Sequence, residues 1–164
     1  MRYAPEIASV VGRKVAEAGA LWLPRGDGWD MAPYRGRLHY RDAMGRLDLP
    51  APRLLGAHQF SNLGLATAML RHQRVLEVSE AALRAAPLWA QNPARLQWLD
   101  KGPLTALLPT GWHVTLDGGH NADAGLAIAA WLGESLGPDE KIDLVIGMLS
   151  NKDLAGYLAP IRPS

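Results

Sequence analysis

Residues 114–149 read VTLDGGHNADAGLAIAAWLGESLGPDEKIDLVIGML, and this stretch decides the fold. A short strand candidate at 114–117 is followed by a helix at about 122–136 and then by a strand candidate at 142–149, which is apolar from Leu144 to Leu149. Strand, helix and strand in this order, with a last strand that is largely apolar, are typical of a parallel sheet covered by helices. The sequence therefore predicts an α/β fold for this part of the chain.

The segments next to this stretch extend the pattern on both sides, and the N-terminal half of the chain shows a different one. A strand at 95–99 and a helix from Lys152 extend the alternation. Towards the N-terminus we expect three helices, at 5–19, at 62–72 and from Ser79 towards Trp89. Between the first two helices, short runs broken by Gly and Pro predict antiparallel strands and turns, at 21–23, 29–31, 37–40 and 47–49. The two patterns meet near residues 90–94.

Composition limits the class of protein. The 164 residues suffice for one ordinary domain or two small ones, and they are 48% hydrophobic and 20% charged, as in a globular protein. The net charge of +1 and its even spread do not favour nucleic acid or a membrane surface as a partner. The chain has no cysteine, which excludes disulfides, thiolate catalysis and cysteine metal sites. With no apolar signal segment, we expect a cytoplasmic protein.

The segment Asp117-Gly118-Gly119-His120-Asn121 is the strongest candidate for a binding site. It follows a predicted strand, and ligands of open parallel sheets bind at the carboxyl ends of strands, where glycines allow close approach. An aspartate at this position can accept both hydroxyls of a ribose. The alternative is an Asx turn followed by a helix N-cap, which is the more frequent role of an isolated Asp-Gly-Gly.

Four segments resemble, in the same order, signatures of the folylpolyglutamate synthase/dihydrofolate synthase family, close relatives of the Mur ligases. The segment from Asp117 to Asn121 is similar to the family's Asp-Gly-Ala-His-Asn-Pro, with Ala122 in place of the proline. His58-Gln59-Phe60-Ser61-Asn62 is similar to the family's His-Gln-x-x-Asn. Pro93-Ala94-Arg95-Leu96-Gln97 is similar to Pro-Gly-Arg-Leu/Phe-Gln. Residues 146–153 are similar to Gly-Met-Leu-x-Asp-Lys-Asp. The order and separations make the combined signal specific.

The resemblance implies a fold and a domain organisation. Residues 1–91 are expected to be an incomplete, C-terminal part of a Mur-ligase-like central ATPase domain, built from helices and small antiparallel strands. Residues 92–164 are expected to be a truncated, Rossmann-like C-terminal ligase domain. The chain would thus be the C-terminal-side portion of a longer enzyme.

The resemblance also implies roles for four residues. Asn62 would contact the adenine of ATP, Arg95 its phosphates and Asp117 its ribose, while His120 would be the catalytic residue, facing the nucleotide or the incoming glutamate. Taken singly, each residue has a plainer alternative: a helix N-cap for Asn62, a solvated strand residue for Arg95, a turn for Asp117 and a helix-start cap for His120. Lys152 and Asp153 fit a functional role and a solvated helix start equally well.

The implied reaction is ATP-dependent ligation through an acyl phosphate. ATP phosphorylates a carboxylate of the pteroate or folate, and the amine of L-glutamate then attacks and displaces phosphate. Binding energy would position the reactants as the domains close and exclude water. The expected cofactors are ATP and Mg²⁺, and the expected partners are folate or dihydropteroate and L-glutamate.

Essential parts of such an enzyme lie outside this sequence. No Gly-x-x-x-x-Gly-Lys-Ser/Thr loop occurs, and no metal ligands are assigned here, because the family's magnesium-binding residues, carbamylated lysine and pterin loop lie upstream. We therefore expect the isolated chain to be inactive and to self-associate through uncovered apolar faces. Two alternatives remain, another Mur-type amino-acid ligase and a non-catalytic nucleotide-binding module or partner of a separate N-terminal half.

Overall fold

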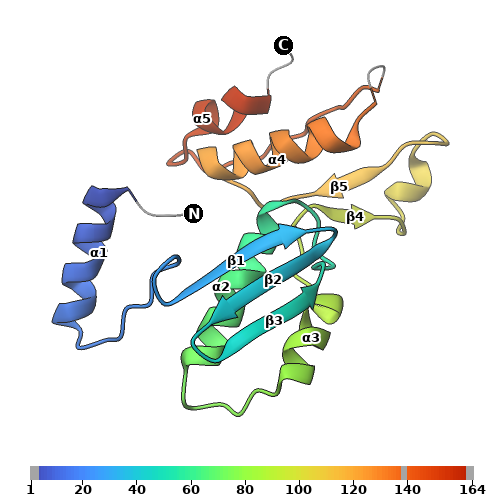
Figure 1. The fold of residues 1–164 in the computed structure, drawn as a ribbon. Helices are drawn as coiled ribbons and strands as arrows, with labels where there is room; N and C mark the ends of the chain where they lie inside the picture. The colour runs from blue at the N-terminus through green and yellow to red at the C-terminus, as the bar shows by residue number, and fades with distance from the viewer. Residues whose placement is uncertain (1–3, 138–139, 162–164) are drawn as a thin grey trace. The chain divides into compact units, whose positions relative to one another are not determined.

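The computed structural model describes residues 4–137 and 140–161. By internal contacts these residues form two compact units (Figure 1). Unit 1 comprises the described residues of Met1–Pro52 and Phe60–Trp89, and unit 2 comprises those of Arg53–Gln59 and Ala90–Ser164. The domain assignments 1–91 and 92–164 stay predictions, because they refer to parts of a larger fold.

Unit 1 is built around a three-stranded antiparallel sheet in the order β1 (Trp29–Tyr34), β2 (Arg37–Asp42) and β3 (Gly45–Pro50). Alternate side chains of the strands point to one face and are buried there, because a strand's side chains alternate between faces. The most deeply buried are Leu38, Tyr40, Leu47 and Leu49, at 0–1% exposure. The strand predictions at 29–31, 37–40 and 47–49 are confirmed, whereas 21–23 forms no strand.

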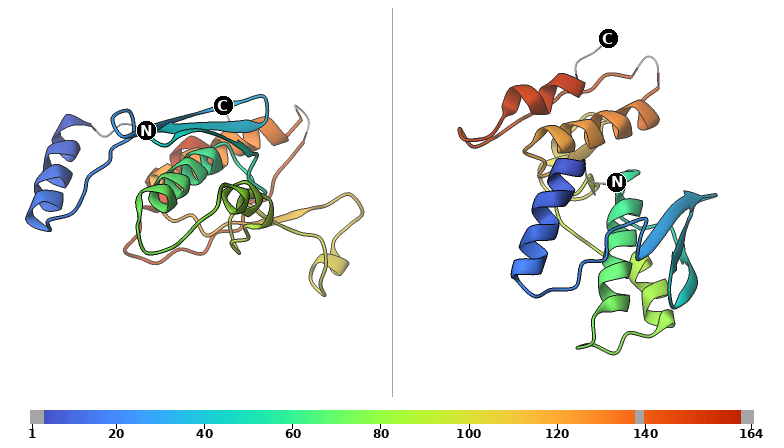
Figure 2. Two further views of the ribbon diagram at one scale, coloured as in Figure 1. Left: turned by 60° about the horizontal axis from the view of Figure 1, so that its bottom comes forward. Right: turned by 60° about the vertical axis from the view of Figure 1, so that its left-hand side comes forward.

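Three helices accompany this sheet, α1 (Pro5–Glu17), α2 (His58–His72) and α3 (Glu80–Trp89). Helix α2 lies along the buried face of the sheet (Figure 2, left), with Phe60, Leu63, Ala68 and Leu70 packed into the core. A Cβ added at Gly64 would come within 2.8 Å of Met31 Cγ, so glycine permits this close packing. Ser79 Oγ accepts the Ala82 amide at the start of α3, as its predicted role at a helix start requires.

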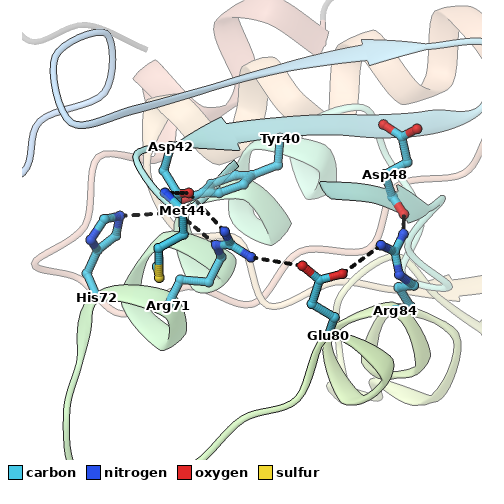
Figure 3. Close-up of polar contacts among 8 residues, drawn as sticks. All are labelled: Tyr40, Asp42, Met44, Asp48, Arg71, His72, Glu80 and Arg84. Atoms are coloured by element: carbon cyan, nitrogen blue, oxygen red, sulfur yellow. Dashed lines mark hydrogen bonds and ion pairs between the residues drawn. The ribbon is translucent and has the colours of Figure 1, made fainter. Parts of the chain in front are cut away.

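A buried ion pair ties α2 to β2 (Figure 3). Arg71 Nε donates to Asp42 Oδ2 at 2.8 Å and Arg71 Nη2 donates to Oδ1 at 2.9 Å. The two side chains are 7% and 0% exposed, respectively. Tyr40 Oη donates to the same carboxylate at 3.1 Å, and His72 Nε2 lies 3.3 Å from it. Burial alone would raise the pKa of Asp42, but the hydrogen bonds from Arg71 and Tyr40 outweigh it, and the pKa is lowered.

Unit 2 contains a two-stranded sheet and a pair of packed helices. The strands are β4 (Gln97–Leu99) and β5 (Val114–Leu116), with the short 3₁₀ helix η1 (Thr105–Leu107) between them. The helices are α4 (Ala122–Ser135) and α5 (Leu154–Leu158), followed by η2 (Ala159–Ile161). Leu96, Ile128 and Tyr157 form the buried core of this unit. A Cβ added at Gly125 of α4 would overlap the backbone of Tyr157, so glycine is what lets α4 and α5 approach.

Two predictions about unit 2 are wrong for the described residues. The apolar run 142–149 forms no strand, and Val145 is 97% exposed. Strands β4 and β5 pair antiparallel, not in parallel. The physical reason is that apolar composition supplies side chains for a buried strand, but the strand forms only when a neighbouring backbone takes up its hydrogen bonds.

Helix boundaries elsewhere follow the predictions closely. The helices expected at 5–19 and 122–136 are Pro5–Glu17 and Ala122–Ser135. The helix expected at 62–72 begins earlier, at His58, and the helix expected from Lys152 begins at Leu154. Within the described ranges, no helix is both long and apolar enough to cross a bilayer.

Candidate functional site

Asp117 lies directly after β5 and makes two hydrogen bonds to main-chain amides. Its Oδ2 accepts the Leu96 amide at 2.8 Å, and its Oδ1 accepts the Gly119 amide at 2.7 Å. The second bond is the Asx turn that the sequence offered as the plainer alternative for this residue. An ionised carboxylate has about four lone-pair positions, so two acceptor positions remain for a ligand. The turn and the binding role are therefore compatible.

The backbone beside Asp117 is held in an unusual conformation. Ala94 and Leu96 have φ values of 55° and 46°, which are left-handed values that side chains other than glycine rarely adopt. The Gly118 amide donates to the Ala94 carbonyl at 2.9 Å, and the Leu96 amide donates to the Asp117 carboxylate. Two hydrogen bonds from the end of β5 thus fix the turn in which Arg95 sits.

Arg95 extends from this turn over Gly118. A Cβ added at Gly118 would lie 3.5 Å from Arg95 Nη1. Arg95 is exposed and precedes β4, so it does not occupy the strand position that the plainer alternative assumed. The turn before β4, and not the strand itself, therefore places the Arg95 guanidinium near the Asp117 carboxylate.

His120 and Asn121 complete the turn before α4. Asn121 Oδ1 accepts the Ala124 amide at 2.9 Å and caps the helix, so His120 is not the cap. His120 is exposed, and its Nδ1 lies 3.2 Å from the Gly118 carbonyl oxygen. The imidazole is thus anchored at one nitrogen and open to a ligand at the other.

The segment 147–152 faces this turn across an open pocket of about 360 Å³. The lining is Asp117, Gly118, Gly119, His120, Gly147, Met148, Leu149 and Lys152. Two segments that the family resemblance singled out, separated by almost thirty residues in the chain, thus form the two sides of one pocket. Lys152 lines it, whereas Asp153 caps α5 by accepting the Gly156 amide at 2.8 Å. Asp153 thus has the helix-start role that the sequence offered, and a functional role for Lys152 stays a prediction.

The charges around the pocket are mixed. Asp117 supplies a carboxylate and Lys152 an ammonium group, and Arg95 stands beside Gly118. Burial, followed by the negative charge of Asp117, raises the pKa of Tyr157 behind the turn. Asp117 can accept hydrogen bonds from hydroxyl groups, and Lys152 and Arg95 can bind anionic groups.

The His58–Asn62 segment divides between the two units. His58 and Gln59 belong to unit 2, where a Cβ added at Gly56 would lie 2.6 Å from His58 Cε1 and 3.2 Å from Leu96 Cδ1. Asn62 belongs to unit 1 and lies one turn inside α2, so it is not the helix N-cap. Of the four predicted site residues, Arg95, Asp117 and His120 lie in unit 2, and Asn62 lies in unit 1.

Sequence reasoning missed two features of this region. Gly147, Met148 and Leu149 were expected in a buried strand but line the pocket as exposed or half-buried loop residues. The Asp117–Leu96 hydrogen bond joins residues that no local pattern connects. Across the two described ranges, no three His, Cys, Asp or Glu side chains cluster as a metal site would require.

Comparisons with known proteins place this geometry in context. No family model matches the chain. The chain is 33% identical over 159 residues to the dihydrofolate synthase/folylpolyglutamate synthase of Escherichia coli strain K12, over 96% of this chain and 34% of that protein. The chain is similar to one third of a folylpolyglutamate/dihydrofolate synthase. A folylpolyglutamate synthase of Lacticaseibacillus casei is 29% identical over 162 residues, over 92% of this chain and 35% of that protein.

Solved structures give the same result for the fold. E. coli FolC in complex with DHPP and ADP has a TM-score of 0.76 at 33% identity, covering 96% of this chain and 34% of that one. Mycobacterium tuberculosis folylpolyglutamate synthase, complexed with ADP and AMPPCP, has a TM-score of 0.71 over 98% of this chain and 35% of that one, at 22% identity. These matches confirm the predicted resemblance to the family and the predicted fold class.

Proposed function

We propose that this chain is part of an ATP-dependent ligase that adds L-glutamate to dihydropteroate, to (poly)glutamyl folates or to both. The observation that carries the proposal is the pocket between Asp117–His120 and Gly147–Lys152, which combines a carboxylate, glycine backbone and the Lys152 ammonium group, with Arg95 beside Gly118. The chain spans about a third of the curated relatives that it matches. Relatives whose structures hold ADP support a nucleotide as the ligand.

The residues of the pocket suit the parts of a nucleotide. Asp117 has free acceptor positions for ribose hydroxyls, and Gly118 and Gly119 let a ligand approach the backbone. Arg95 offers a planar fork that matches phosphate oxygens, and His120 faces the nucleotide or the incoming glutamate. For Asn62, we propose a contact with adenine through its carboxamide, which can donate and accept at once.

The proposed reaction has two steps. A carboxylate oxygen of the pteroate or folate attacks the γ-phosphorus of ATP, which forms an acyl phosphate and releases ADP. The amine of L-glutamate then attacks the acyl carbon, an amide bond forms, and inorganic phosphate leaves with the acyl oxygen while the amine loses a proton. This chain's residues would bind and orient the nucleotide, and Arg95 would stabilise negative charge near the phosphates.

The residues present do not provide the whole of that reaction. Magnesium is expected in such an enzyme, but the described residues offer no cluster of ligands for it. The sequence also contains no phosphate-binding loop with the Gly-x-x-x-x-Gly-Lys-Ser/Thr pattern. We therefore expect the 164-residue chain by itself to show no glutamate-dependent release of phosphate from ATP. Steady release by the purified chain would contradict this expectation.

An ADP titration followed by backbone amide NMR tests the binding proposal. ADP should shift the amide signals of Gly118, Gly119 and Gly147 together. Asp117→Ala should weaken the affinity for ADP about ten- to hundredfold, since a hydrogen bond to a charged group contributes about 1.5–3 kcal/mol. Asp100→Ala, which removes an exposed carboxylate outside the pocket, is the matched control and should change nothing. ADP-induced shifts that avoid these glycines would overturn the proposal.

The two alternatives predict different results. Another Mur-type ligase would use UDP-linked substrates in place of folates, and the similarity to folate enzymes argues against it. A partner of a separately encoded N-terminal half would co-purify with a chain that carries a phosphate-binding loop. Comparison of folate and UDP-linked substrates in the reconstituted enzyme separates the first alternative, and co-purification separates the second.

A further inference from the structure

The face of the three-stranded sheet that points away from α2 is rich in arginine. Along the three strands, the side chains opposite in direction to the buried ones are Asp30, Ala32, Tyr34, Arg37, His39, Arg41, Arg46, Asp48 and Pro50. Arg35 extends from the β1–β2 turn, where it has a φ of 48°. We call Arg35, Arg37, Arg41 and Arg46 the arginine face. Within the described part of unit 1, no helix covers it (Figure 2, left).

One pair of arginines on this face has its like charges on directly opposite strand positions. Arg41 of β2 and Arg46 of β3 are direct cross-strand partners, and like charges in that position destabilise a sheet. Within the described ranges the Arg46 side chain makes no hydrogen bond or ion pair. Arg41 has only Asp30, at 3.7 Å, and that carboxylate already accepts a hydrogen bond from Arg25 at 3.0 Å. An anion between Arg41 and Arg46 would relieve this repulsion.

A second pair of cations lies at the other end of β2. Arg35 stacks over the ring of Tyr34 at 5.1 Å, and Arg37 makes one long contact, 3.5 Å, with the Asp48 carbonyl oxygen. Between the two pairs, His39 Nδ1 lies 2.6 Å from Asp48 Oδ1. The arginine face therefore consists of two pairs of arginines separated by the His39–Asp48 contact.

The distance between the two ends limits what can bind. Positions 37 and 41 are four residues apart on one strand, which corresponds to about 13 Å. An anionic ligand that contacts both ends must therefore extend over roughly that distance, within the reach of the arginine side chains. In an extended γ-linked glutamate chain each residue adds five backbone bonds instead of three and extends the chain by about 6 Å, so two repeats span the distance. Each repeat carries one free carboxylate.

We propose that the arginine face binds the oligo-γ-glutamyl tail of a folate, with tail carboxylates at the Arg35–Arg37 and Arg41–Arg46 ends. This inference rests on the proposed function, which supplies a substrate and product with such a tail. Exposed ion pairs contribute about two- to fivefold each to affinity, and salt screens them. A weak contact suffices for a tail whose folate end is already bound, because the tether keeps its local concentration high.

The test is an amide NMR titration of the 164-residue chain with tri-γ-L-glutamate at low salt. The signals of β2 and of the β1–β2 and β2–β3 turns should shift. Citrate carries a similar net negative charge, but its three carboxylates lie within about 6 Å of one another and reach only one end of the face. It should therefore bind at least about threefold more weakly, since it lacks the ion pairs at the other end. Equal affinity for the peptide and for citrate would overturn the proposal and indicate general attraction for anions.

Substitutions locate the binding site. Arg41→Ala combined with Arg46→Ala should lower the affinity for tri-γ-L-glutamate about tenfold, through the loss of two exposed ion pairs. Arg13→Ala combined with Arg74→Ala removes the same charge from exposed positions elsewhere, and should change the affinity less than twofold. Both double variants should keep wild-type circular dichroism, because all four side chains are exposed. An equal loss in both variants, or no binding by the wild-type chain, would overturn the proposal.

The outcome is separable from that of the proposed function. Asp117→Ala should lose ADP affinity and retain tri-γ-L-glutamate binding, because Asp117 lies in unit 2 and the arginine face in unit 1. A chain that responds to ADP but not to the peptide refutes only the tail site. A chain that fails to respond to ADP refutes the nucleotide site, whatever the peptide does.

Discussion

The Asp117 carboxylate accepts the Leu96 amide at 2.8 Å, so the end of β5 holds the turn that carries Arg95. The two residues are distant in sequence, and Ala94 and Leu96 on either side of Arg95 both have left-handed backbone conformations. An isolated chain would rarely populate that turn. Asp117 therefore positions Arg95 in addition to any contact that it makes with a ligand.

Asp117→Ala should destabilise unit 2 by about 1–3 kcal/mol, because the Leu96 and Gly119 amides lose their acceptor. Hydrogen exchange measured residue by residue should accelerate at these two amides more than at those of α4. Asp117→Asn retains one acceptor oxygen and should restore part of the protection. Unchanged exchange at Leu96 in the alanine variant would show that the turn is held by other contacts.

Ala94→Gly should stabilise the chain. A left-handed conformation costs an alanine about 1–2 kcal/mol, whereas glycine adopts it freely at an entropic cost of about 0.5–1 kcal/mol. With φ of 55° at Ala94, we expect a net gain of up to about 1 kcal/mol in urea unfolding of unit 2. Ala130→Gly, at an exposed position inside α4, is the control and should lose about 1 kcal/mol. A loss in both variants would contradict the strained turn.

Gly125→Ala should destabilise unit 2 and displace α5. The added Cβ would overlap the Tyr157 backbone, which cannot move aside as a flexible side chain could. Overpacking of this kind typically costs about 1–3 kcal/mol. Gly133→Ala lies in the same helix with nothing within 4 Å of the added Cβ, and it should stabilise by about 0.5–1 kcal/mol. Thermal unfolding of the two variants should therefore shift in opposite directions, and shifts of the same sign would refute the contact.

The Asp42–Arg71 ion pair should make unit 1 sensitive to acid. The folded pKa of Asp42 is lowered, so its contribution to stability is complete above the unfolded pKa of about 4 and is lost as pH falls through the folded value. Asp42→Asn should cost about 3–5 kcal/mol at pH 7, because Arg71 would stay buried without a counterion. The loss should shrink on titration from pH 5 to pH 2.

Asp48→Asn is the matched control for this prediction. The Asp48 side chain is 54% exposed, and its contact with His39 lies at the surface. Exposed pairs contribute at most about 1 kcal/mol, so the variant should unfold almost like the wild type. Urea unfolding followed at several pH values measures both variants. A small, pH-independent effect of Asp42→Asn would show that the buried pair does not stabilise unit 1.

Local patterns in the sequence determined most helices, the strands of unit 1 and the identity of the pocket residues. Helix-spaced apolar residues placed α1 and α4, and alternation placed β1 to β3, because these periods reflect the geometry of a single element. The Asp117–Asn121 and 146–153 segments are likewise local, and both line or adjoin the pocket. Such features are readable because each depends on residues close together in the chain.

Tertiary structure alone decided what these elements pair with. Residues 142–149 are apolar enough for a buried strand, but without a neighbouring backbone they form a loop that lines the pocket. The Asp117–Leu96 bond, the Asp42–Arg71 ion pair and the opposition of Arg41 to Arg46 likewise join residues that only the fold brings together. Hydrogen bonds and ion pairs depend on distance in space, and no periodicity in the sequence records that distance.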